Sequence, residues 1–161
     1  MPYRCAPART GKFGYGTGPA LRRRPRPVDA TSQEGRRNMK RKALIVDDQP
    51  DIRKLIMMTM ESEDFDLYEA DNGETAWIVA QKLRPQLILL DVMMPGALDG
   101  YQVCEKVKAD PALAGNTKVI LLTARGQKTD IERGHEAGCD AYLVKPFSPI
   151  ELLDTVDRLV P

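Results

Sequence analysis

The chain has 161 residues and a mass of 18.0 kDa, with 42% hydrophobic, 29% charged and 6% aromatic residues. These values suit one globular domain with a tail, and they exclude a chain that is disordered throughout and a collagen-like repeat. The net charge of +1 combines a basic segment, residues 1–38 at +7, with an acidic remainder, residues 39–161 at −6.

Hydrophobic runs and cysteines indicate the compartment. In residues 39–161 the longest uninterrupted apolar run, Ala76 to Ala80, has five residues, whereas a membrane-spanning helix needs about 20. No apolar segment typical of a secretory signal follows the N-terminus. Cys5, Cys104 and Cys139 are odd in number and widely separated, so they predict neither a disulfide framework nor a CxxC metal site. We expect a cytoplasmic protein without membrane contact.

Residues 1–38 are predicted to form a disordered basic arm. They contain five Gly, five Pro and no periodic apolar face, so they cannot bury enough surface to offset the entropy of ordering. The run Arg22-Arg23-Arg24-Pro25-Arg26 leaves nucleic-acid binding open as an alternative function of the arm, although short basic tails are often only solvated. Met39, just before the first predicted strand, leaves open a second alternative, in which translation starts there and the arm is not made.

Beyond residue 41, short apolar runs alternate with helical patterns in a regular order. Strands are expected at residues 43–46, 66–70, 86–90, 118–122 and 141–144. The first three helices are expected on these sets: Ile52, Leu55, Ile56 and Thr59 after Pro50; Ala76, Trp77, Ala80 and Leu83 before Pro85; and Tyr101, Cys104, Val107 and Lys108 before Asp110-Pro111. A polar helix is expected around residues 127–137, and a last helix on Leu152, Leu153, Val156, Leu159 and Val160.

This pattern of five βα units predicts an α/β fold. Strands that are apolar on both faces indicate a parallel sheet with helices covering both sides, and the strand at 66–70 is expected nearer an edge. Right-handed crossovers place the C-terminal ends of all strands at one edge of the sheet. Ligand sites of open α/β sheets lie at that edge, so the residues that follow each strand are the candidate site.

The residues at the strand ends are chemically informative. Asp47 and Asp48 end the first strand, Asp91 the third, Thr123 the fourth and Lys145 the fifth. Carboxylates brought together repel one another unless a cation compensates, and hard oxygen ligands suit Mg²⁺ with phosphate as a co-ligand. An aspartate in such a site can act as a nucleophile toward phosphorus. Alone, an acid or threonine at a strand end can equally cap the next helix; the five together indicate phosphoryl transfer.

Four segments resemble the signature of the receiver domain of bacterial two-component response regulators. They are Val46-Asp47-Asp48, Leu89 to Gly96 (LLDVMMPG), Leu121-Leu122-Thr123-Ala124, and Gly138 to Phe147 (GCDAYLVKPF). The resemblance covers about residues 41–160 and implies a flavodoxin-like, doubly wound five-stranded parallel sheet in the order 2-1-3-4-5. The domains would then be the arm, residues 1–38, and a receiver domain, residues 39–161.

The resemblance also implies a role for each site residue. Asp91 would accept a phosphoryl group from a sensor histidine kinase or a histidine phosphotransfer protein. Asp48, Asp91 and the backbone carbonyl of Met93 would bind Mg²⁺, or Mn²⁺ in its place, with Asp47 acting through metal-bound water. Lys145 would pair with the phosphoryl group.

Three further features are implied in the same way. The peptide bond between Lys145 and Pro146 would be cis. Thr123 and Tyr142 would form the switch that responds to phosphorylation. The exposed face of the fourth helix, fifth strand and fifth helix would then change shape and bind a downstream protein target.

Several alternatives are weighed against this interpretation. Because the chain ends at Pro161, just after the last predicted helix, we expect a stand-alone receiver whose output is protein contact or onward transfer of the phosphoryl group. The sequence has no cyclase or hydrolase motif, so we do not expect an enzyme. A phosphatase of the haloacid dehalogenase type is disfavoured, since Met93 stands where that class needs a second aspartate. A module that signals without phosphate stays an alternative, which the complete acidic set argues against. One residue more than the commonest family spacing separates Pro95 from Asp99, so a longer loop is expected there.

Other conspicuous residues are expected to be structural. Met57, Met58 and Met60 are expected to fill the core, and Trp77 to be half-buried against the sheet. His135, the only histidine, lies on a polar helix without an accompanying ATP-binding signature, so we expect it on the surface.

Overall fold

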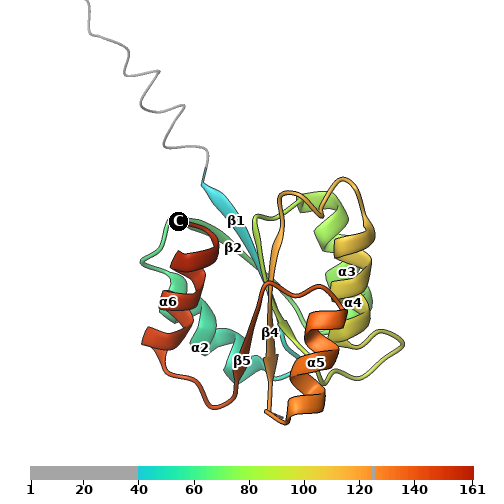
Figure 1. The fold of residues 1–161 in the computed structure, drawn as a ribbon. Helices are drawn as coiled ribbons and strands as arrows, with labels where there is room; N and C mark the ends of the chain where they lie inside the picture. The colour runs from blue at the N-terminus through green and yellow to red at the C-terminus, as the bar shows by residue number, and fades with distance from the viewer. Residues whose placement is uncertain (1–39, 125) are drawn as a thin grey trace, which may run out of the picture. The chain divides into compact units, whose positions relative to one another are not determined.

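A computed structural model of the chain describes residues 40–124 and 126–161, and the predictions for residues 1–38 and Met39 lie outside this range. Five parallel strands form one sheet in the order β2-β1-β3-β4-β5, which confirms the predicted topology (Figure 1). The strands are β1 (Arg41–Val46), β2 (Phe65–Ala70), β3 (Leu87–Asp91), β4 (Lys118–Thr123) and β5 (Ala141–Val144). The helices are α2 (Pro50–Met60), α3 (Gly73–Leu83), α4 (Gly100–Ala109), α5 (Lys128–Glu136) and α6 (Pro149–Leu159).

The helices form two layers around the sheet. Helices α3, α4 and α5 cover one face, and α2 and α6 cover the other (Figure 1). Strand β2 is an edge strand, as expected from its mixed composition, while β3 in the centre is buried along its whole length. None of these helices in the described part of the chain is long and apolar enough to cross a membrane.

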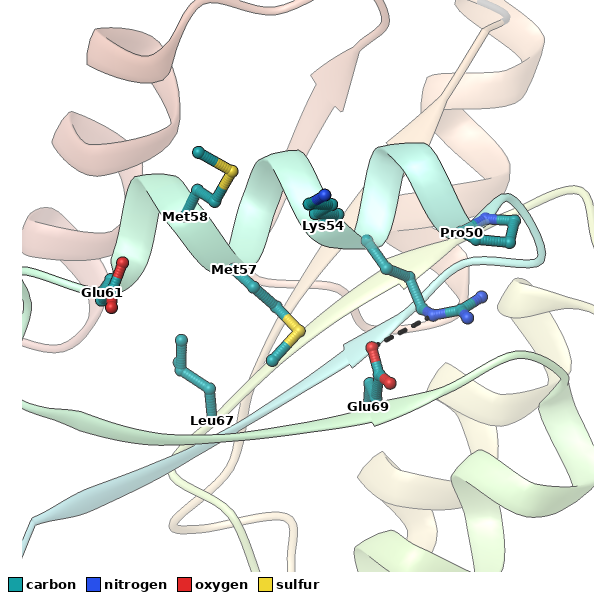
Figure 2. Close-up of a pocket in the computed structure, with 8 residues that line it drawn as sticks. Pro50, Lys54, Met57, Met58, Glu61, Leu67 and Glu69 are labelled. Carbon is teal, nitrogen blue, oxygen red and sulfur yellow. Dashed lines mark hydrogen bonds and ion pairs between the residues drawn. The ribbon is translucent and has the colours of Figure 1, made fainter.

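Helix α2 departs from the predicted apolar stripe. Ile56 and Met60 are buried, whereas Leu55 is 51% exposed and Met58 is 63% exposed. The helix carries four consecutive apolar residues, which 100° steps distribute around its axis, so only those spaced by four face the sheet. The expectation that Met58 fills the core was therefore wrong, and Leu55 of the predicted helical set lies largely outside the core. Figure 2 shows Met57 pointing toward Leu67 of β2 and Met58 pointing away from it.

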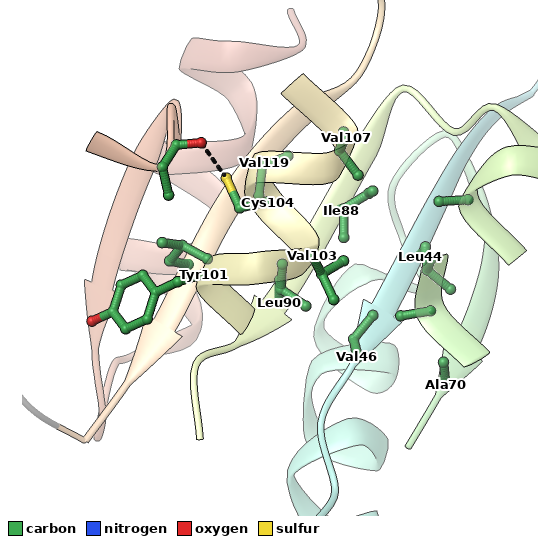
Figure 3. Close-up of a cluster of buried hydrophobic side chains, with 14 of the residues drawn as sticks. Leu44, Val46, Ala70, Ile88, Leu90, Tyr101, Val103, Cys104, Val107 and Val119 are labelled. Carbon is green, nitrogen blue, oxygen red and sulfur yellow. Dashed lines mark hydrogen bonds between the residues drawn. The ribbon is translucent and has the colours of Figure 1, made fainter. Parts of the chain in front are cut away.

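Two apolar cores arise from the alternation of side chains along the strands. Leu44 and Val46 of β1 pack with α3 and α4, whereas Ala43 and Ile45 of the same strand pack with α2 and α6. The same alternation continues through β3 and β4. Figure 3 shows the first core, in which the Cys104 thiol donates a hydrogen bond to the Ala137 carbonyl at 3.4 Å. Two cores of this kind hold the sheet rigid between the helix layers, as the site at its edge requires.

The remaining structural expectations concern single residues. Trp77 is partly buried against the first core, as predicted, and the ammonium of Lys106 lies 5.4 Å from its ring centroid. His135 is exposed, also as predicted. Cys104 and Cys139 are free thiols, and burial raises the pKa of Cys104 to about 12, so its thiol stays protonated and unreactive.

Reciprocal side-chain caps fix where α4 and α6 start. Asp99 accepts a hydrogen bond from the Gln102 amide, and the Gln102 side chain accepts one from the Asp99 amide, which begins α4. Ser148 and Glu151 form the same reciprocal pair at the start of α6. These two helices follow β3 and β5, so the caps help to fix the strand ends that carry Asp91 and Lys145.

The central strand should be sensitive to truncation. We expect Leu90→Ala to lower the free energy of unfolding by about 2–5 kcal/mol, because Leu90 is fully buried and its loss leaves a cavity between rigid layers. The matched control, Met58→Ala, should change it by less than about 0.5 kcal/mol, since Met58 is largely exposed. Urea denaturation followed by circular dichroism measures both. Equal effects of the two substitutions would contradict the assigned burial.

Candidate functional site

Three aspartates meet at the C-terminal edge of the sheet. Strands β1 and β3 are neighbours with Val46 opposite Leu90, so the acids that follow, Asp47 and Asp91, lie side by side. One carboxylate oxygen from each of Asp47, Asp48 and Asp91 lies within 4.8 Å of the others. Asp47 and Asp91 are buried, while Asp48 is not. The edge therefore holds two buried acids beneath a more accessible third.

Lys145 supplies the positive charge of this cluster. Its Nζ lies 2.6 Å from Asp47 Oδ2 and 3.4 Å from Asp91 Oδ1. Lys145 follows the edge strand β5, and its backbone amide donates to the Thr123 carbonyl at 2.6 Å, which ties it to the end of β4. The peptide bond between Lys145 and Pro146 is cis. The ammonium group thus reaches the two buried acids from the end of the edge strand β5.

Backbone amides orient the two buried carboxylates. Asp47 Oδ1 accepts a hydrogen bond from the Gln49 amide at 2.9 Å, and Asp91 Oδ1 accepts one from the Met93 amide at 3.3 Å. Both donors stand two residues after the acid, so each strand turns directly around its own carboxylate. Met93, predicted to offer its backbone carbonyl, is thereby placed in the turn next to Asp91.

The cluster is electrostatically strained without a cation. The pKa of Asp91 is raised to about 6, first by burial and then by the negative charge of Asp47, while Lys145 acts in the opposite direction. Hard oxygen donors, an excess of negative charge and access through Asp48 are the properties of a magnesium site. The donor set of Asp47, Asp48 and Asp91 therefore fits a divalent cation better than it fits a purely structural network.

Thr123 and Tyr142, the predicted switch residues, lie on neighbouring strands. Thr123 is fully buried at the end of β4, beside the strand that ends in Asp91. Tyr142 lies on β5, partly buried, and packs against the first core. Helix α5 has Gly134 at this point, where a Cβ atom would come within 3.1 Å of the Tyr142 ring. A larger residue at this position would require the tyrosine ring to shift by a few tenths of an ångström.

The structure adds residues that the sequence pattern did not single out. Gly100 opens α4 so close to β3 that a Cβ atom there would collide with the Asp91 carbonyl. Glu74 of α3 accepts a hydrogen bond from the Ala97 amide, within the longer loop, and backbone amides hold the pKa of Glu74 below its usual range. Arg53 of α2 donates to the Asp47 carbonyl at 2.7 Å. All three residues contact backbone groups, and such contacts leave no periodic pattern in the sequence. The pair Asp99-Gly100 is the exception, because it marks a helix start.

Comparison with known proteins identifies the family of this fold. The sequence model of the response regulator receiver domain matches residues 43–157. The chain belongs to the response regulator receiver domain family. It is 43% identical over 119 residues to the transcriptional regulatory protein ResD of Bacillus subtilis, which covers 74% of the chain and 48% of ResD. The receiver domain thus spans about half the length of the curated relatives it matches.

Solved receiver structures agree with this assignment. A putative response regulator from Chloroflexus aurantiacus is 33% identical with a TM-score of 0.69, over 74% of this chain and 96% of that one. The BeF3-activated DrrB receiver domain is 31% identical with a TM-score of 0.67, over 76% and 98% of the two chains. Receiver domains are phosphorelay signalling modules rather than conventional enzymes, and they generally bind Mg²⁺ through an acidic cluster, which this chain possesses.

The raised pKa of Asp91 makes stability depend on pH. Below about pH 3.8 the carboxyl is protonated in both the folded and the unfolded chain. Between about pH 3.8 and 6 the unfolded chain loses this proton more readily than the folded chain, so the free energy of unfolding falls as pH rises through this window. In EDTA, Asp91→Asn should therefore raise the free energy of unfolding by about 1–2 kcal/mol near pH 7.5, allowing for solvent screening, and by little near pH 4.

Thermal unfolding at the two pH values measures this effect. Asp66→Asn is the control, because Asp66 is exposed and lies outside the cluster. A gain for Asp91→Asn that is equal at both pH values, or matched by the control, would contradict the raised pKa.

Proposed function

We propose that this receiver domain accepts a phosphoryl group on Asp91 in a Mg²⁺-dependent phosphorelay. The observation that carries the proposal is the contact geometry of Asp91, a buried carboxylate 3.4 Å from Lys145 within an acidic cluster. Asp48, Asp91 and the Met93 carbonyl would hold the ion, with Asp47 reaching it through water. When bound, Mg²⁺ would neutralise negative charge on the carboxylates and on the incoming phosphoryl oxygens.

The residues of the chain then have defined tasks. An oxygen of Asp91 attacks phosphorus, forming an O–P bond while the bond to the donor, a histidine nitrogen of the partner, breaks with its electron pair. Lys145, whose ammonium contacts both Asp47 and Asp91, would move that ammonium to a phosphoryl oxygen, because its four-carbon stem is flexible. The Thr123 hydroxyl would donate to a second oxygen.

Thr123 and Tyr142 would transmit the change to the surface. Movement of Thr123 toward the phosphoryl group would free space at the end of β4, into which Tyr142 on β5 can shift. The surface of α5, β5 and α6 is then the proposed contact for a downstream protein target. Local charge at the site would in this way shift the population of two arrangements of that surface.

Small phosphodonors test the acceptor directly. With acetyl phosphate and Mg²⁺, we expect the intact mass of the protein to increase by one phosphoryl group, and EDTA to prevent this. Asp91→Asn should abolish labelling because it removes the nucleophile, whereas the exposed-acid variant Asp66→Asn should be labelled like the wild type. Equal labelling of Asp91→Asn and wild type would refute the assignment of Asp91.

An apolar surface beside the site suits the phosphodonor protein. Ile52 and Leu55 of α2, with Pro146 and Phe147 after β5, line a hollow of about 310 Å³ that Lys145 also borders. Leu55 is 51% exposed there, although Leu residues are usually buried. Because a donor histidine must come within bonding distance of Asp91, its carrier has to seat next to this patch. The patch is therefore the proposed contact for a histidine kinase or phosphotransfer protein.

Loss of this contact should separate protein donors from small ones. We expect Leu55→Ser to slow phosphoryl transfer from the cognate kinase or phosphotransfer protein about tenfold, because an apolar anchor of the complex is lost. Labelling by acetyl phosphate should not change, since the acid cluster is intact. Ile78→Ser is the matched control, because Ile78 is also 51% exposed but lies on α3. Slowing by both substitutions alike would contradict the proposed docking patch.

A further inference from the structure

We propose that Arg53 is a positioning residue for the metal-binding acids, acting through the backbone of Asp47. The inference rests on the proposed function of the site as a magnesium-dependent acceptor. Arg53 touches no carboxylate of the cluster in the contacts described, so it differs in kind from Lys145, which contacts two. Its role would be to hold the turn that carries the acids.

The contacts of Arg53 connect two strands and a helix. From the first turns of α2, its guanidinium donates to the Asp47 carbonyl at 2.7 Å through one terminal nitrogen. Its Nε lies 3.4 Å from Glu69 of the edge strand β2, the ion pair drawn as a dashed line to Glu69 in Figure 2. The Arg53 side chain is only 15% exposed, whereas Glu69 is 53% exposed. A planar guanidinium can hold both partners at once, which a single ammonium cannot do as well.

The carbonyl that Arg53 holds belongs to the peptide between the two adjacent acids. Asp47 itself is fixed by its amide, which donates to Ala70 at 3.2 Å, and by Gln49 and Lys145 at its carboxylate oxygens. The Asp48 carboxylate, among the described residues, has neither a hydrogen bond nor an ion pair of its own. Its position therefore depends on the orientation of the preceding peptide plane, and Arg53 fixes that plane at its oxygen.

The Arg53–Glu69 pair borders two hollows. A groove of about 540 Å³ and a smaller hollow of about 210 Å³ are each lined in part by Arg53 and Glu69. Without the guanidinium, the Asp47 carbonyl would lose its fixed donor, and mobile water from these hollows would take the place of that donor. The turn could then rotate, and Asp48 would leave the arrangement that brings its oxygen near those of Asp47 and Asp91.

A positioning role and a purely electrostatic role of Arg53 predict opposite changes in Mg²⁺ affinity when Arg53 is replaced. A nearby positive charge repels Mg²⁺, so its removal alone should tighten binding of the ion. Loss of the hydrogen bond that orients the acids should instead weaken binding, typically about tenfold for groups that orient metal ligands. Lys54, the next residue on α2, lines the same groove and is exposed. Lys54→Gln removes the same charge without removing the contact, and is the matched control.

The experiment measures Mg²⁺ affinity of the full chain by calorimetry, with thermal unfolding in EDTA as a check on the fold. We expect Arg53→Gln to raise the Kd for Mg²⁺ about tenfold, and Lys54→Gln to leave it unchanged or lower it slightly. Arg53→Lys keeps the charge, but a single ammonium cannot hold both the Asp47 carbonyl and Glu69 as the guanidinium does, so it should raise the Kd severalfold. At saturating Mg²⁺, labelling of Arg53→Gln by acetyl phosphate should return to the wild-type rate.

The outcomes separate this inference from the proposed function. Wild-type protein that does not bind Mg²⁺ refutes both. Wild type that binds while Arg53→Gln binds equally or more tightly overturns only the role of Arg53, as does weakening by Lys54→Gln to the same extent. If Arg53→Gln does not fold in EDTA, Arg53→Lys decides: a severalfold loss of affinity supports the proposal, and unchanged affinity overturns it.

Discussion

Repulsion among carboxylates gathered at one edge of the sheet is the constraint on which this receiver domain depends. Parallel strands with right-handed crossovers bring Asp47 and Asp91 together even though both carboxylates are negatively charged and repel each other. Lys145 compensates in part, but the pKa of Asp91 still lies near 6, which shows that its ionised form is strained in the folded chain. A divalent cation would relieve that strain, so the proposed affinity for Mg²⁺ has its physical basis in the way the sheet is built.

The rigid layers around the sheet make that constraint effective. Central strands such as β3 are buried on both faces, so the strand ends cannot separate to relieve the repulsion. The turns after β1 and β3 are also short, with the amides of Gln49 and Met93 donating back to the acids that precede them. Relief must then come from a ligand rather than from movement of the backbone, and this is the condition that a reversible binding site needs.

Features that repeat along the sequence, or that occur at a defined place in the fold, could be predicted from the sequence. Apolar alternation along β1, β3 and β4 predicted a two-faced parallel sheet, and the acids at the strand ends predicted the cluster, because both signals repeat or recur at defined places. Met58 was assigned to the core wrongly, and Leu55 of the predicted helical set is exposed, since four consecutive apolar residues do not define one face of a helix. Contacts from a side chain to a distant backbone group, such as Glu74 to Ala97, carry no pattern and could be found only in three dimensions.

Helix α2 is where the separate parts of the proposal meet. Its sheet-facing side carries Ile56 and Met60 in the core, its first turns carry Arg53 against the Asp47 carbonyl, and its outer side presents Leu55 beside Pro146. A partner bound to the outer side would contact the same helix that holds the turn carrying Asp47 and Asp48. The geometry of phosphoryl transfer and the recognition of its donor would then be set by one helix, whose position is fixed by packing against β1 and α6.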